Sequence, residues 1–147
     1  MRFELWPCRV EDLISVDVQR MQRAQVTPTI LRGLQDQFLY LYARALKCEG
    51  KTFAVFGVNP ARSHVGFGWA LLSEQVLTYP VALTKAAWAL IEKAQSILDL
   101  WRLEIAVDTK HESALRWAQL LGFEVEGMMR CFGPNREDAY LMARIWS

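Results

Sequence analysis

The segment Trp101–Glu126, WRLEIAVDTKHESALRWAQLLGFEVE, is the clearest structural pattern in the chain. Residues 101–107 are apolar and rich in strand formers at a period of two, which predicts a β-strand. Residues 112–121 carry apolar side chains at helical spacing, and Gly122 follows where a helix takes a left-handed cap. Strand-forming residues then resume. A strand, a helix and a strand this close together predict a helix packed on one face of a sheet.

The length and composition of the chain are typical of one globular domain over residues 1–147. A hydrophobic fraction of 52% supplies enough apolar side chains for a core, which argues against a disordered chain. The net charge of +1 argues against a protein that coats nucleic acid. No apolar run reaches the roughly 18 residues of a membrane span. We therefore expect no membrane association and no nucleic-acid partner.

Three cysteines, Cys8, Cys48 and Cys131, stand far apart and form no CxxC pattern. An odd number of cysteines cannot pair completely, so we expect reduced thiols and no metal site. Reduced thiols favour a location in the cytoplasm of a cell or inside a virion.

The remaining elements follow from periodicity and from proline and glycine breaks. We expect a hairpin whose turn lies at residues 59–63. Helices inserted singly between strands predict an α/β fold, with a mixed, mostly antiparallel central sheet and helices on both faces. The expected strands are 3–10, 52–58, 65–76, 101–107, 123–132 and 138–146, and the expected helices are 11–21, 30–46, 83–100 and 112–121.

This order of elements resembles that of the GNAT N-acetyltransferase family. Ala114, Gly122 and Phe123 stand at places that match the family's local signature on the helix-to-strand unit near the C-terminus. The resemblance covers residues 52–145. It implies a GNAT fold, acetyl-CoA as the cofactor, and transfer of an acetyl group to an amine on a small molecule or a protein.

Two features depart from the family pattern. The family's helix carries a tyrosine four residues before the glycine, and here that place is Ala118, which cannot donate a proton; His111 replaces the family's asparagine. The family also places a glycine-rich loop before its long helix, where backbone N–H groups bind the CoA pyrophosphate. The corresponding segment 76–83 contains a proline and no glycine. The resemblance therefore implies a weakened cofactor loop.

A narrower resemblance covers residues 68–126, in which Ser73–Val76 precede the long helix. It is to the small GNAT-like internal virion proteins of T-seven-like short-tailed phages. It implies a phage or prophage protein whose partners are virion proteins.

Two residues are candidates for catalysis. Glu74 follows the strand that would lie beside the acyl group, and a carboxylate there can take the proton of the amine. His111 follows the central strand and titrates near neutral pH. The simpler interpretations are a solvated carboxylate for Glu74 and a helix-entry residue with local hydrogen bonds for His111.

The candidate cofactor-binding residues are Ser73, Val81, Thr84 and Lys85. The hydroxyls can contact a pantetheine arm or a phosphate, and the start of the long helix near Val81 offers free N–H groups beside the charge of Lys85. The simpler interpretations are turn, cap and surface residues. Two hypotheses stay open: an acetyl-CoA-dependent N-acyltransferase, and a catalytically silent GNAT scaffold that serves virion assembly. An open cleft between splayed strands favours the first, and a filled cleft with an exposed apolar patch favours the second.

Overall fold

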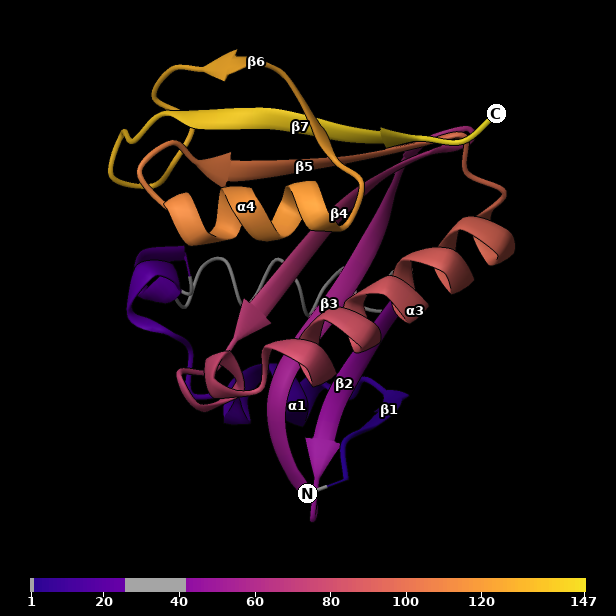
Figure 1. The fold of residues 1–147 in the computed structure, drawn as a ribbon, viewed down its shortest axis with the longest axis vertical. Coiled ribbons are helices and arrows are strands. Elements are labelled where there is room, and N and C mark those ends of the chain that lie inside the picture. The colour runs from indigo at the N-terminus through magenta and orange to yellow at the C-terminus, as the bar shows by residue number, and fades with distance from the viewer. Residues whose placement is uncertain (1, 26–41) are drawn as a thin grey trace.

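A computed structural model describes residues 2–25 and 42–147. Seven strands form one sheet in the order β1-β2-β3-β4-β5-β7-β6 (Figure 1). The strands are β1 (Glu4–Pro7), β2 (Tyr42–Cys48), β3 (Lys51–Arg62), β4 (Val65–Leu72), β5 (Arg102–Asp108), β6 (Glu124–Met129) and β7 (Ala139–Ile145). The helices are α1 (Val10–Ser15), α3 (Pro80–Leu98) and α4 (Glu112–Leu120), with short 3-10 helices at Arg20–Gln25 and Gln75–Thr78. The mixed α/β sheet predicted from the sequence is confirmed.

Apolar side chains fill both faces of the sheet. On one face, α3 and the end of α4 pack on strand residues that include Phe56, Val58 and Leu103. On the other face, α1 packs through Leu13 on Val55 and its neighbours. Adjacent residues of a strand point to opposite faces, so a strand buried on both faces is apolar throughout. Within the described residues, no helix is both long and apolar enough to cross a membrane.

The strands β4 and β5 pair over only a short length at the centre of the sheet. The two strands run parallel and pair only between Val65–Phe67 and Arg102–Glu104. Beyond this point β4 continues to Leu72 beside β3, whereas β5 continues to Asp108 beside β7. The two strands diverge towards their carboxyl ends (Figure 1). The sheet therefore has a gap that opens towards the end of β4.

The predicted helix at residues 30–46 is wrong where the structure describes it. Tyr42–Cys48 form β2, between β1 and β3. Residues 30–41 of that prediction lie outside the described residues. Alanine, arginine, leucine and lysine are good helix formers, but Ala45 and Leu46 are almost fully buried in the sheet. Packing in a central strand overrides the intrinsic preference of such residues.

Other boundaries also differ from the predictions. The first helix ends at Ser15, and Arg20–Gln25 form a separate 3-10 helix. The hairpin is confirmed, but β3 continues through the expected turn, and the chain reverses at residues 63–64 with His64 at a positive φ of 64°. The strand expected over 65–76 ends at Leu72. The strand, helix and strand expected over residues 101–126 are confirmed as β5, α4 and β6, with Gly122 at φ 92°.

A buried ion pair fixes α1 to the sheet. Asp12 is 2% exposed and contacts Lys47 Nζ at 2.9 Å. The same carboxylate accepts hydrogen bonds from the Arg9 N–H at 2.8 Å and from the Thr52 hydroxyl at 3.0 Å. Burial alone would raise the pKa of Asp12, but these hydrogen bonds and the charge of Lys47 outweigh it and lower that pKa.

All three cysteines are free. Burial, reinforced by the charge of Asp12, raises the pKa of Cys8 to about 12. The Cys8 thiol therefore stays protonated and is not a nucleophile.

Candidate functional site

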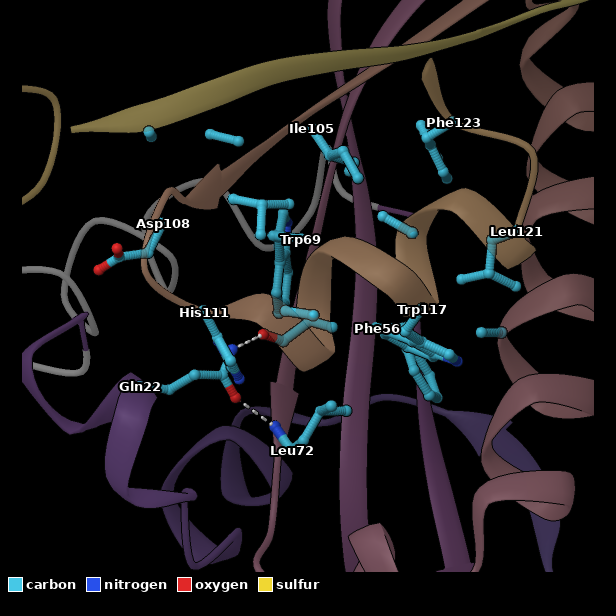
Figure 2. A pocket seen from close by; sticks show the side chains of 18 of the residues that line it. Gln22, Phe56, Trp69, Leu72, Ile105, Asp108, His111, Trp117, Leu121 and Phe123 are labelled. Atoms are coloured by element: carbon cyan, nitrogen blue, oxygen red, sulfur yellow. Dashed lines mark hydrogen bonds between the residues drawn. The ribbon is translucent and has the colours of Figure 1, made fainter. Parts of the chain in front are cut away.

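A cavity of about 490 Å³ lies in the gap between β4 and β5. Its walls come from β3, β4 and β5, from the inner faces of α3 and α4, and from the β6–β7 loop (Figure 2). The size falls in the range of small-ligand sites in proteins. The cavity exists because the two central strands diverge while the helices on that face stay packed.

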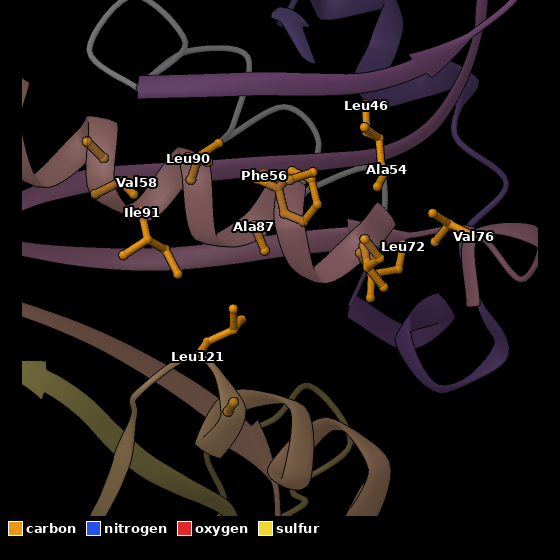
Figure 3. Packing of buried hydrophobic residues seen from close by; sticks show 14 of the residues in the cluster. Leu46, Ala54, Phe56, Val58, Leu72, Val76, Ala87, Leu90, Ile91 and Leu121 are labelled. Atoms are coloured by element: carbon orange, nitrogen blue, oxygen red, sulfur yellow. The ribbon is translucent and has the colours of Figure 1, made fainter. Parts of the chain in front are cut away.

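The walls are mainly apolar and aromatic. On the α3 side, Ala87, Leu90 and Ile91 face Phe56 and its neighbours on β3 (Figure 3). They are buried, and they form a floor without polar side chains between helix and sheet. Such a floor offers water no side-chain hydrogen-bond partner and suits the uncharged part of a ligand.

Two tryptophans on the walls have their indole N–H groups satisfied. Trp69 Nε1 donates to Asn59 Oδ1 at 2.8 Å, and Trp117 Nε1 donates to Thr84 Oγ1 at 3.1 Å. The second bond joins α4 to α3. These bonds fix the orientation of both rings, and hence the shape of the cavity.

His111 lines the cavity at the start of α4. Its backbone N–H donates to the Asp108 C=O at 3.0 Å, which closes the turn between β5 and α4. Burial lowers the pKa of His111, and the Asp108 carboxylate opposes this only in part. The imidazole is therefore neutral at pH 7 and can accept a proton.

The two charged residues on the described cavity wall, Asp108 and Glu137, are both acidic. Asp108 accepts a hydrogen bond from the Lys110 N–H at 2.8 Å, and Glu137 accepts one from the Asn135 N–H at 2.9 Å. Among the described residues that line the cavity there is no lysine or arginine. The local field favours a positively charged or neutral ligand group at this end.

The fold is shared with proteins of known structure. The fold is that of the GNAT acetyltransferases. Ard1 from Thermoplasma volcanium matches with a TM-score of 0.81 and 16% identity, over 100% of this chain and 99% of that one. A chimera of the Vibrio cholerae spermidine N-acetyltransferase SpeG and hSSAT matches with a TM-score of 0.77 and 10% identity, over 99% of this chain and 96% of that one. An acetyltransferase of the GNAT family from Streptococcus pneumoniae matches with a TM-score of 0.69 and 18% identity, over 99% of this chain and 100% of that one.

These identities are low, so the likeness is one of fold. No protein-family model matches the chain, and no curated protein matches its sequence significantly. Within the described residues there is no group of three or more histidine, cysteine or acidic side chains that could hold a metal ion.

The GNAT fold does not bring the two candidate catalytic residues to the same wall. His111 lines the cavity, but Glu74 does not. Glu74 is exposed in the turn after β4, where its Oε1 accepts a hydrogen bond from the Arg20 N–H at 2.7 Å. Ser73 also lies away from the cavity: it is 3% exposed, and its hydroxyl accepts from the Val76 N–H at 3.1 Å. Both residues hold the turn that follows β4.

The other three candidate cofactor residues do lie together. Val81, Thr84 and Lys85 line a shallow, open hollow at the start of α3, with Pro80 as the first helical residue. Val81 is 66% exposed, so the helix N-terminus is open to a ligand. The first N–H groups of a helix lack partners within it and carry a partial positive charge. This hollow suits a phosphate group, although Pro80 removes one donor.

Sequence reasoning missed two glutamines. Gln19 and Gln22 line the cavity from the segment that follows α1. Gln19 falls near the end of the helix expected over residues 11–21 and Gln22 just after it, where polar residues usually face solvent. Their contact with β4 joins residues about fifty positions apart in the sequence, and no local sequence pattern predicts such a contact.

Proposed function

We propose that the chain is an N-acyltransferase that transfers an acetyl group from acetyl-CoA to an amine. The observation that carries this proposal is the cavity between the diverging strands β4 and β5 on a GNAT fold, with neutral His111 on its wall. The open cleft favours the enzyme over a scaffold whose cleft is filled.

The residues present fit acetyl-CoA in two places. The apolar cavity can hold the acyl group and the uncharged arm, and the hollow at Val81, Thr84 and Lys85 can hold the phosphates by N–H groups and charge. Bound acetyl-CoA would supply an activated acetyl thioester. The thiol of CoA, with a pKa near that of cysteine at about 8.5, can leave as a thiolate without a strong acid. The absence of a hydroxyl at Ala118 is therefore compatible with the reaction.

His111 would take the proton of the substrate ammonium, directly or through one water, so that the free amine can attack the thioester carbon. The acidic wall at Asp108 and Glu137 would favour the ammonium form on binding. Glu74 is the second candidate for the base, but its carboxylate already accepts a hydrogen bond from the Arg20 N–H outside the cavity lining.

The test is calorimetric titration of acetyl-CoA, followed by a screen of amine acceptors. We expect micromolar binding that weakens at least tenfold in Lys85→Glu and is unchanged in His111→Gln. His111→Gln should lower kcat by 100-fold or more, the typical contribution of a general base, whereas Glu74→Gln should change it little. Absence of heat and of any thermal shift at millimolar acetyl-CoA would contradict the proposal.

The second candidate is a catalytically silent scaffold that acts inside a phage particle. Two observations favour it: the loop before α3 has no glycine, and the apolar side chains of Ile97, Trp101 and Ile145 are more than half exposed. Its partners would be virion proteins, as the narrower sequence resemblance suggests. This candidate predicts no acetyl-CoA binding, so the titration above separates the two.

A further inference from the structure

The segment Val18–Gln22 lies along the open end of β4, where β5 has diverged. Val18 forms an isolated antiparallel bridge with Ser73. The Gln19 N–H donates to the Leu72 C=O at 2.6 Å. The segment therefore covers part of the β4 edge that the gap in the sheet exposes.

The Gln22 side chain completes this cover inside the cavity. Its Nε2 donates to the Ala70 C=O at 2.5 Å, and its Oε1 accepts from the Leu72 N–H at 2.9 Å (Figure 2). The same Oε1 also accepts from Gln19 Nε2 at 3.1 Å. One carboxamide thus bonds a donor and an acceptor of β4, as a peptide group of a neighbouring strand would.

This arrangement has a clear physical cause. Backbone groups that face an apolar cavity without hydrogen-bond partners destabilise the fold, so the free edge of β4 needs a partner. A ligand that enters the cavity with amide groups of its own would bond the same edge, as in strand addition. It cannot do so at Ala70 and Leu72 while the Gln22 carboxamide is there.

The carboxamide can leave without the rest of the segment. The Gln19 N–H bond to Leu72 involves backbone atoms only. The Arg20 N–H is held separately by the Glu74 carboxylate at 2.7 Å. Gln22 itself is only half-buried, so rotation of its side chain would release the Ala70 C=O and the Leu72 N–H, with loss of its contact with Gln19 Nε2.

We propose that the Gln22 carboxamide is an internal competitor for the β4 edge, which the amide-bearing arm of the acyl donor must displace on binding. This inference rests on the proposed function, because the donor arm of acetyl-CoA carries secondary amides. The free protein is then mostly in a closed state, and the apparent affinity for the donor falls by the fraction that is open.

The first experiment compares acetyl-CoA affinity in three proteins by calorimetry: wild type, Gln22→Ala and Gln95→Ala. Gln95 is the matched control, because its Nε2 also donates to a backbone carbonyl, that of Leu100 at 2.9 Å, outside the cavity lining. We expect roughly tenfold tighter binding in Gln22→Ala, the effect of removing one or two competing hydrogen bonds, and no change in Gln95→Ala. A purely structural role for Gln22 would weaken binding, so unchanged or weaker binding overturns the inference. Gln22→Met, which keeps the length of the side chain but not its hydrogen bonds, should behave as Gln22→Ala does.

The second experiment follows the Leu72 amide by hydrogen exchange in the same proteins. Its exchange should be faster in Gln22→Ala than in wild type and should slow again when acetyl-CoA binds. Binding that leaves the NMR signals of the Gln22 side-chain amide unchanged in wild type overturns the inference while the proposed function stands. Failure of every variant to bind acetyl-CoA contradicts the proposed function. In that case the test is repeated with pantetheine, which has the same amides without the nucleotide. If pantetheine slows hydrogen exchange at the Leu72 amide at a lower concentration in Gln22→Ala than in wild type, the competitor role is supported. If it does not slow this exchange in either protein, the competitor role is overturned.

Discussion

Asp12 and Gln22 both hold the N-terminal part of the chain on the sheet, but in opposite ways. Asp12 is a buried charge enclosed by Lys47, Thr52 and the backbone of Arg9. Gln22 is an uncharged amide that bonds one edge of β4 from within a cavity of about 490 Å³. A buried charge cannot lose its partners without a large penalty, whereas an amide beside open space can exchange one set of partners for another. The first contact therefore stabilises the fold, and the second is suited to a ligand.

The largest effect should come from Asp12→Ala. It leaves the half-buried Lys47 without its counter-ion and the Arg9 N–H and Thr52 hydroxyl without an acceptor, so we expect the free energy of unfolding to fall by about 3–5 kcal/mol. Urea denaturation measures this change. Glu11→Ala, at an exposed acid next in sequence, is the control and should stay within about 0.5 kcal/mol of wild type. An Asp12→Ala protein as stable as this control would remove the distinction between the two contacts.

A second effect is the loss of stability in acid. Because the pKa of Asp12 is lower in the folded protein than the unfolded value of about 3.9, its contribution is fully present above that value and is lost as the pH falls through it towards the folded pKa. Urea midpoints between neutral pH and about pH 3 should fall more steeply for wild type than for Asp12→Asn. Parallel profiles for the two proteins would show that Asp12 is not the group that titrates.

The smallest effect should come from Gln22→Ala. Neutral hydrogen bonds make a net contribution of about 0.5–1.5 kcal/mol each. Because Gln22 is only half-buried, water can take its place on β4, so we expect the free energy of unfolding to fall by no more than about 1 kcal/mol. The same urea titration measures it beside Asp12→Ala. A loss as large as that of Asp12→Ala would make Gln22 a structural residue and would count against its role as a competitor.

The sequence predicted the parts of the fold in which local preference and tertiary environment agree. The unit of β5, α4 and β6 follows from strand alternation, helical spacing and Gly122, and all three agree with the packing found. The segment Tyr42–Cys48 shows the opposite case, because its helix-forming residues lie in a central strand. Burial of Ala45 and Leu46 between two layers outweighs propensities of less than about 1 kcal/mol per residue.

The site was predictable only in part. Four candidates stand beside recognisable element boundaries. The structure places His111 on the cavity wall and Val81, Thr84 and Lys85 in one hollow, while their roles stay predictions. Ser73 and Glu74 occupy the expected place in the chain, but their side chains bond the turn and the neighbouring segment.

By itself, the sequence determined the order of most strands and helices, the mixed α/β class and the position of the helix that follows His111. Those features depend on periodicity and capping, which act over a few residues. Only the tertiary structure decided that β4 and β5 separate after three paired residues, that a cavity opens there, and that Gln22 bonds the exposed edge. These depend on contacts between residues up to about fifty positions apart, whose geometry is set by the packing of whole elements.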